Sequence, residues 1–484
     1  MSKLIKNEFK KLFSKKLMLI LFVIAIGFTI LTNILYNIDD PYNNEEYLKE
    51  ELSYLEEELK TLDYKLEEDN EYYIDLKTEY DLTKLRLNYD SESWQHNFIN
   101  SSDIVYSNLR KINENTYGIN KDEQKLSKAK KEFNTIKTRL DTGDWKSFVQ
   151  EQLEDKKEEI DFYEEQLKNI TDKKTIQELN STIETEKVNK QALEWRLEKE
   201  IPYDNSFLSG KIEEYTNSFQ SVQSLKDKEN KTKEEEQEYN SALKQMNTSK
   251  YYIKNNINIK NEYDGRYILI NLMQEYGMFI LIFSVIVAGT IVSNEFQKGT
   301  IKLLLTRPYS RNKILLSKYI VSIISIFIFI ILFALLQYFI GGIISGFNVF
   351  NTPVVEYDLA TNSIEGISVF KYLIIIILSN LPIYILTSTL AFALSTLTMN
   401  SAVSIAIPIL GNMVSDIINA FIEKVKILKY FVTANWNLGV YLFGGQGLAE
   451  GLNFWLSLAI CIIYLLIMIV TAFIVFNKRD IKNV

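Results

Sequence analysis

Long apolar runs alternate with polar segments along this chain of 484 residues. A helix needs roughly 20 apolar residues to cross the hydrocarbon layer of a membrane, because each backbone polar group must be bonded within the segment. Six runs approach this length and predict six membrane-spanning helices. The fifth is the weakest, since it contains Pro408, Gly411, Asn412 and Asp416, and a partial or re-entrant helix is the alternative. The six runs are 17–36, 267–292, 319–344, 372–398, 402–421 and 452–476.

Lysine and arginine beside these runs predict their orientation, because cytoplasmic flanks carry the excess of these residues. Residues 1–16 hold six lysines and one acid, Glu8, and residues 293–318 hold six basic residues and one acid, Glu295. With six spans these clusters and the basic C-terminus fall on one side, so both termini are expected in the cytoplasm. The lysines between 424 and 429 disagree, since they fall on the predicted outer side.

Residues 37–264, between the first two runs, show a helical pattern. Leucines recur in steps of four and three from Leu48 to Leu66, which is the spacing of a coiled-coil seam. We therefore expect an extracytoplasmic coiled-coil domain that runs out and back. About 45 residues from Asn44 would project as one helix of roughly 65 Å, with the weakly periodic residues 91–122 at the tip. The domain is either a plain stalk or a surface that binds a partner or gates a substrate.

Charged residues divide the chain in the same way. Residues 37–264 hold 52 acidic and 34 basic side chains, a formal charge of −18, whereas the rest of the chain holds 10 acids and 20 bases and carries +10. The acidic balance disfavours a nucleic-acid partner. A single cysteine, Cys461, excludes an intrachain disulfide, and with one histidine, His96, it also disfavours a metal site. The expected fold is an all-α polytopic membrane protein with six spans and a coiled-coil domain between the first two.

The most informative segment, residues 291–320, follows the second run. It reads I-V-S-N-E-F-Q-K-G-T-I-K-L-L-L-T-R-P-Y-S-R-N-K-I-L-L-S-K-Y-I. Apolar side chains between Ile301 and Leu305 form one stripe, and Lys298 and Lys302 lie four residues apart on another face. Such an amphipathic element can lie on a membrane or dock into a groove of a cytoplasmic protein.

This segment resembles the permease subunits of type-2 ABC exporters, whose second and third spans are joined by E-F-x-x-G-T-I-K-x-L-L-x-x-P-x-S-R-x-x-I-L-x-S-K. The end of the chain, 476–481, is similar to the family's F-x-x-R-D-I, and residues 1–16 resemble its cytoplasmic amphipathic elbow helix. The resemblance covers residues 1–36 and 265–484, whereas the insertion at 37–264 departs from the smaller members. The matching residues of the central run are Glu295, Phe296, Gly299, Thr300, Leu304, Leu305, Pro308, Ser310, Arg311, Lys313 and Lys318.

The resemblance implies a transport subunit that is not an enzyme and holds no cofactor. No G-x-x-x-x-G-K-[ST] phosphate loop occurs in the sequence, so ATP and magnesium would be bound by a pair of separate ABC ATPase subunits. A second permease chain, identical or homologous, would complete the path within the membrane lipid. The expected substrate is a peptide, a lipid-like molecule or a hydrophobic drug, exported through the cell membrane. The Ile-, Asn- and Lys-rich composition indicates an AT-rich genome, and we expect a Gram-positive bacterium.

Within this interpretation, residues 293–318 are the coupling helix that passes motion of the ATPases to the spans. Gln274, Glu275 and Asp416 are expected to line the path, because polar groups inside a membrane are rare unless they serve a function. For the first two, a water-exposed helix end is an equally good explanation. The residues assigned to ATPase coupling are Glu295, Phe296, Gly299, Thr300, Arg307, Pro308, Arg311 and Lys318.

Two other classes of protein share some of these features. A membrane-anchored scaffold or receptor would use the coiled coil to bind a surface partner, but it would need only one or two spans. A polysaccharide chain-length regulator also carries an outer coiled coil, yet it would have two spans and nothing similar to residues 293–318.

Overall fold

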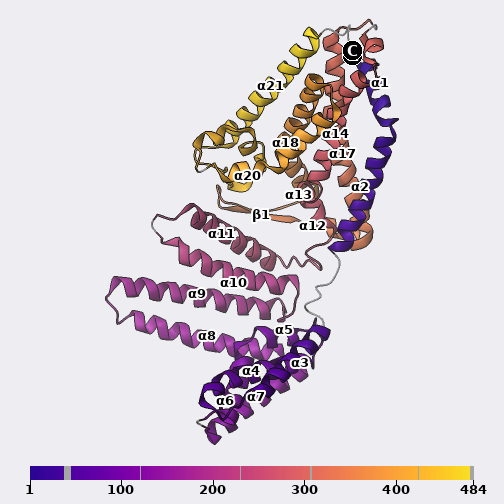
Figure 1. The fold of residues 1–484 in the computed structure, drawn as a ribbon. Coiled ribbons are helices and arrows are strands. Elements are labelled where there is room, and N and C mark those ends of the chain that lie inside the picture. The colour runs from indigo at the N-terminus through magenta and orange to yellow at the C-terminus, as the bar shows by residue number, and fades with distance from the viewer. Residues whose placement is uncertain (37–44, 120, 229, 306–307, 423, 480–484) are drawn as a thin grey trace. The chain divides into compact units, whose positions relative to one another are not determined.

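The computed structural model describes residues 1–36, 45–119, 121–228, 230–305, 308–422 and 424–479 (Figure 1). The chain divides into two compact units: unit 1 is Met1–Asn37 with Glu262–Val484, and unit 2 is Ile38–Asn261. Both units are mostly helical. Some residues considered above lie outside the described part: Arg307, Asp480, Ile481 and the side chains of Leu304 and Leu305.

Unit 1 holds five helical segments that, within the described residues, are long and apolar enough to cross a membrane. They agree with the expected class of a helical polytopic membrane protein, while the number of six spans stays a prediction. The five segments are α2, Lys16–Leu35; α17, Arg311–Ser345; α18, Val369–Thr398; Ser401–Ala420, made of α19, Ser401–Met413, and α20, Ser415–Ala420; and α21, Phe454–Lys478.

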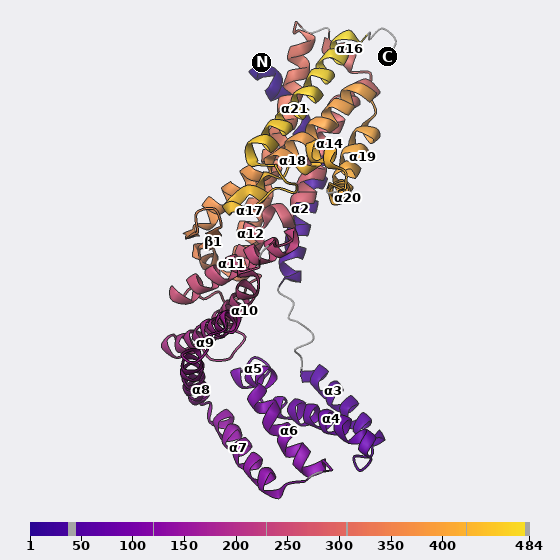
Figure 2. The same cartoon turned by 90° about the vertical axis from the view of Figure 1, so that its left-hand side faces the viewer.

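The second apolar run differs from the expected continuous helix. It is divided into α12, Gly265–Ile270, α13, Leu272–Glu275, and α14, Gly277–Ile291. A Cβ atom on Gly277 would lie 2.6 Å from the Tyr384 hydroxyl of α18, so α14 begins where only glycine permits this close approach. From there α14 packs against α17, α18 and α19 (Figure 2). Most of its side chains are buried. The run therefore forms the centre of the helix bundle.

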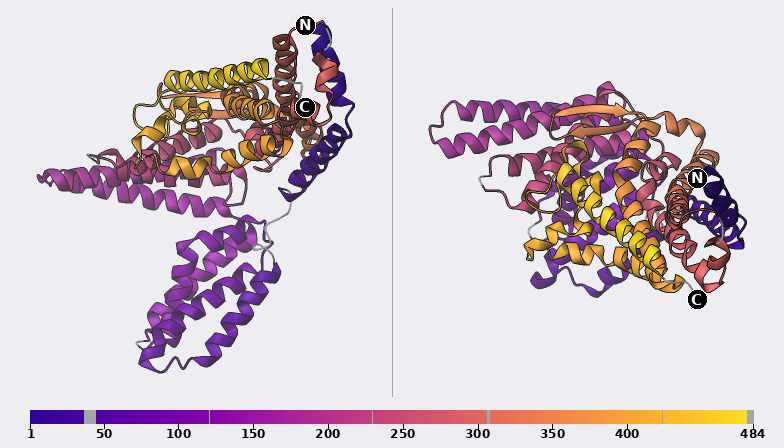
Figure 3. Two further views of the ribbon diagram at one scale, coloured as in Figure 1. Left: turned by 45° about the horizontal axis from the view of Figure 1, so that its top comes forward. Right: turned by 90° about the horizontal axis from the view of Figure 1, so that it is seen from above.

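Shorter elements complete unit 1. The strands β1, Val354–Asp358, and β2, Ser363–Ile367, form an antiparallel hairpin, which the all-α expectation did not include. The yellow helix α21 lies along the orange helix α18 (Figures 1 and 3). The remaining elements are α1, Ser2–Phe13; α15, Ser293–Gln297; α16, Ile301–Leu305; and the 3₁₀ helices η2, Phe347–Asn351, η3, Lys426–Tyr430, η4, Val432–Ala434, and η5, Leu438–Gly444.

Unit 2 is an array of helices in which α3 packs on α4, α6 on α7, α8 on α9, and α10 on α11. Polar N-cap side chains, Asp122, Asp144, Asp172, Ser206 and Thr232, accept backbone N–H groups and begin five of the helices. The helices are α3, Glu45–Thr61; α4, Glu67–Arg86; α5, Trp94–Ser101; α6, Asp103–Tyr117; α7, Glu123–Thr142; α8, Trp145–Leu167; α9, Lys173–Glu198; α10, Phe207–Lys226; and α11, Lys233–Lys254.

The expectation of one long helix starting at Asn44 is wrong. Helix α3 ends at Thr61 and α4 begins at Glu67. Between them Asp63 accepts the backbone N–H groups of Lys65 and Leu66, which closes a turn. The heptad spacing of leucines continues through this turn, so periodicity alone did not reveal it.

Residues 91–122 contain the whole of α5 and α6, and their place at the tip stays a prediction. Phe98 and Val105 lie buried in the apolar cluster that joins these helices to α4, α7 and α8. A short helix contributes few turns to a periodic pattern, which is why the sequence signal was weak.

Candidate functional site

Three of the residues assigned to coupling, Glu295, Thr300 and Lys318, meet Glu8 and Lys11 in a largely buried ionic cluster between α1, α15 and α17. The Lys318 Nζ atom lies 2.7 Å from Glu8 Oε2 and 3.3 Å from Glu295 Oε1. Lys11 forms a further ion pair with Glu295, and the Thr300 hydroxyl donates a hydrogen bond to the same carboxylate. Lys318 is 1% exposed and Glu295 is 4% exposed. The ionic cluster therefore joins three helices largely beneath the surface, with the half-exposed Lys11 at its edge.

Hydrogen bonds from two distant serines hold α15 in place. The Ser395 Oγ atom accepts a hydrogen bond from the Ser293 backbone at 2.9 Å, and it donates one to the Gly289 carbonyl at 2.8 Å. The Ser293 and Ser401 hydroxyls lie 2.7 Å apart. These contacts tie the start of α15 to the end of α18 and the start of α19.

Gly299 turns the chain from α15 into α16. Its φ angle of +66° lies in the left-handed region, where a side chain would be strained. The turn brings Thr300 back over Glu295. The glycine of the motif thus has a backbone role in building the ionic cluster.

The charged neighbours determine the state of the Glu295 carboxyl. Burial alone would raise its pKa, but Lys318, Lys11 and the Thr300 hydroxyl outweigh this effect and lower the pKa to about 2. Glu295 is therefore ionised throughout the physiological pH range, and its charge stabilises the folded state.

The stabilisation from Glu295 is expected to fall with pH in a defined range. Because the folded-state pKa lies below the ordinary value of 4.5, the contribution is complete above about pH 4.5 and is lost as the pH falls toward 2. Its size is on the order of 3 kcal/mol. Unfolding measured in detergent at several pH values should show the difference between the natural chain and Glu295→Gln shrinking across this range. A difference independent of pH would contradict the assignment.

A second set of contacts joins α17, α18 and α21 at their ends. The Arg311 guanidinium donates to the carbonyl oxygens of Asn477 at 3.1 Å and Arg479 at 2.9 Å. Arg479 in turn donates to the carbonyls of Thr396 at 2.7 Å and Leu397 at 2.8 Å. These groups are among the last carbonyls of their helices, which have no partner within the helix. Arg311 and Arg479 therefore hold helix ends together.

The segment 291–320 also has an exposed side. Its exposed residues include Gln297, Lys298, Lys302, Leu303 and Pro308. We call residues 297–303 the basic surface. It combines two cations with Leu303, which is 73% exposed, and the ionic cluster lies directly under it.

The expected path residues differ in their surroundings. Gln274 is exposed beside α13's partly buried Glu275, which accepts a hydrogen bond from the Tyr36 hydroxyl at 2.8 Å. Asp416 is exposed in the first turn of α20. No side chains of His, Cys, Asp or Glu in the described ranges gather as a group of three that would hold a metal ion.

Sequence reasoning missed a buried polar cluster inside the bundle. The Gln337 carbonyl oxygen accepts hydrogen bonds from Asn33 at 2.8 Å and from the Tyr276 hydroxyl at 2.6 Å, and its amide nitrogen donates to the Gly265 carbonyl at 3.2 Å. The sequence feature that could have revealed this cluster is a single amide residue in each of two apolar runs, Asn33 in 17–36 and Gln337 in 319–344. Glu8 was also missed as a partner of Lys318, although it is the one acid among the lysines of residues 1–16.

The fold and these contacts define a helical membrane protein with a large helical insertion. Residues 238–482, just over half of the chain, match the family described as "Protein of unknown function (DUF2705)", and the chain belongs to this family. It is similar to "Uncharacterized protein YhcI" of Bacillus subtilis (strain 168), with 34% identity over 208 residues, which cover 42% of this chain and 64% of the relative.

A second relative is "Uncharacterized membrane protein YdbK" of the same organism, with 28% identity over 205 residues, which cover 41% of this chain and 76% of the relative. The chain thus spans less than two thirds of the length of YhcI. No solved structure matches the chain.

Proposed function

We propose that this chain is the membrane-spanning permease subunit of an ATP-binding cassette exporter. Its energy comes from separate ATPase subunits that bind ATP and magnesium, and two permease chains surround the path. The substrate is a peptide, a lipid-like molecule or a hydrophobic drug. The termini and the basic surface face the cytoplasm, and residues 37–264 lie outside the cell.

One observation carries this proposal: an exposed basic surface lies over a buried ionic cluster that joins three helices. A push on residues 297–303 would pass through Glu295 and Lys318 to α1 and α17, because buried ion pairs are costly to separate. Packed helices respond to such a load by shifting as rigid bodies. The description of YdbK as a membrane protein and the motif resemblance support the same function.

Labelling tests the side of the membrane on which the basic surface lies. The one native cysteine, Cys461, is buried, so Cys461→Ser gives a background for a single introduced thiol at Lys302→Cys. A membrane-impermeant thiol reagent is expected to label this variant in inverted vesicles and not in intact cells. Lys426→Cys, on the predicted outer side, should show the reverse. Labelling of Lys302→Cys in intact cells would overturn the proposal.

Co-purification tests the coupling itself. The tagged chain, co-expressed with the ABC ATPase expected to be encoded beside it, should retain that ATPase through purification and change its rate of ATP hydrolysis. A purified chain that transports without any ATPase would contradict the proposal. A chain that binds a surface partner through unit 2 and no ATPase would favour the scaffold.

A further inference from the structure

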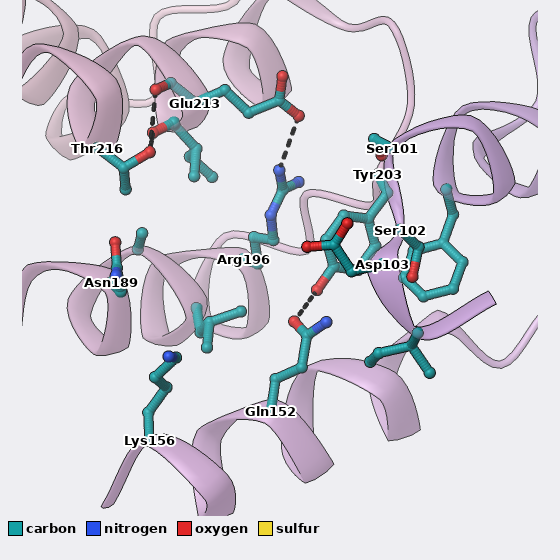
Figure 4. A pocket seen from close by; sticks show the side chains of 15 residues that line it. Ser101, Ser102, Asp103, Gln152, Lys156, Asn189, Arg196, Tyr203, Glu213 and Thr216 are labelled. Atoms are coloured by element: carbon teal, nitrogen blue, oxygen red, sulfur yellow. Dashed lines mark hydrogen bonds and ion pairs between the residues drawn. The ribbon is translucent and has the colours of Figure 1, made fainter. Parts of the chain in front are cut away.

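Unit 2 contains a cavity of about 390 Å³, a volume in the range of small-molecule sites. It is lined by the junction of α5 and α6 and by faces of α8, α9 and α10 (Figure 4). Phe98, Ile104, Ala192, Leu193 and Ile212 supply apolar wall. The remaining lining is polar and charged, so the cavity suits a ligand with an apolar body and a polar end.

The two cations of the cavity already have partners. The Arg196 guanidinium, which is 3% exposed, donates to the Pro202 carbonyl at 2.7 Å and to Ser209 Oγ at 3.1 Å. It also lies 3.4 Å from a Glu213 carboxylate oxygen and stacks over the Tyr203 ring at 4.3 Å. Its role is therefore to hold α9, α10 and the loop between them together.

Lys156 is engaged in the same way. Its Nζ atom lies 2.7 Å from Glu159 and 2.8 Å from Glu186. The cavity lining itself holds two carboxylates, Asp103 and Glu213, and two cations, Lys156 and Arg196. Because both cations are already paired with carboxylates, the charge left for a ligand is that of Asp103, and a cationic ligand is favoured over an anionic one.

Asp103 is the carboxylate that remains. It is exposed in the first turn of α6, and within the part of the chain that the structure describes it has no ion pair. Beside it, the Ser102 Oγ atom is buried without a hydrogen-bond partner. A buried hydroxyl without a partner is destabilising, because it has lost its hydrogen bonds to water. A ligand that donates hydrogen bonds would satisfy both groups.

We propose that this cavity binds an organic cation, a primary ammonium group on an apolar body. The ammonium group lies against Asp103 and Ser102, and the apolar body packs against Phe98, Ile104 and Leu193. This site is independent of the proposed transport function, because binding needs neither an ATPase nor a second chain.

Three matched ligands test the proposal on the full-length chain in lipid nanodiscs. Phenethylamine is titrated beside phenethyl alcohol and 3-phenylpropionate, which carry the same ring with a neutral or an anionic end, and empty nanodiscs are subtracted. The amine is expected to bind about tenfold more tightly than the alcohol, since a charge-assisted hydrogen bond contributes about 1.5 to 3 kcal/mol. Equal binding of the amine and the alcohol, or tighter binding of the propionate, would overturn the proposal.

Variants place the ligand within the cavity. Asp103→Asn should weaken amine binding about tenfold, whereas Asp103→Glu should keep it within about threefold. The matched control is Asp161→Asn, which removes one charge from an exposed site on α8 outside the cavity lining. An equal loss in Asp161→Asn, or no loss in Asp103→Asn, would show that the amine binds elsewhere. Thermal unfolding of each variant confirms that it is folded.

Discussion

Replacing Lys318 with methionine is expected to lower the free energy of unfolding by about 3 to 5 kcal/mol. The side chain is 1% exposed and pairs with Glu8 and Glu295, so its removal leaves Glu8 without this cation and Glu295 with Lys11 as its remaining cation. Lys11, which is half exposed, can compensate only in part. Thermal unfolding in detergent, followed by circular dichroism, measures the effect.

Lys313→Met is the matched control, because Lys313 is exposed on the first turn of the same helix. Its effect should stay below about 0.5 kcal/mol, as for most surface substitutions. The double variant Lys318→Met with Glu8→Gln should recover part of the loss, since it also removes the carboxylate that has lost its cation. Equal effects of Lys318→Met and Lys313→Met would show that the ionic cluster does not stabilise the fold.

Reversing the charge of the basic surface is expected to abolish co-purification of the ATPase. Lys298→Glu combined with Lys302→Glu places two negative charges where two exposed cations stand. Like charges brought together at an interface cost several kcal/mol, so the affinity should fall by at least about a hundredfold. Both side chains lie on the surface, and the thermal unfolding of the chain itself should change little.

The control is Lys424→Glu with Lys426→Glu, the same charge reversal at exposed residues on the predicted outer side. This variant should co-purify with as much ATPase as the natural chain does. If it loses the ATPase as well, the loss reflects net charge. If Lys298→Glu with Lys302→Glu keeps the full amount, the basic surface is not the coupling surface.

Most of the membrane-capable helices follow directly from apolar runs. The runs 17–36, 319–344, 372–398 and 452–476 all lie largely within helices long enough to cross a membrane. The break before Gly277 could not be read in this way, and the close approach of Gly277 to Tyr384 involves a side chain of another helix. The end of α3 could not be predicted for a different reason. The leucines keep their spacing through the short turn between α3 and α4, so their periodicity does not reveal the turn.

The motif located the candidate site but not the orientation of its side chains. Glu295 and Lys318 were expected to face a partner, and the structure buries both while leaving Lys298 and Lys302 outside. Glu8, the second carboxylate that pairs with Lys318, lies 310 positions from it along the chain, a separation that no local pattern can bridge.

The amino-acid sequence alone determined that apolar helices alternate with polar ones, that the charge is divided between two parts, and that a basic amphipathic segment follows the second run. These properties depend on composition and short-range periodicity. Only the tertiary structure decided which charges of that segment are buried, that α14 forms the centre of the bundle, and that a cavity lies beside Asp103. Each of those depends on which distant side chains pack together, because burial and pairing are set by neighbours in space.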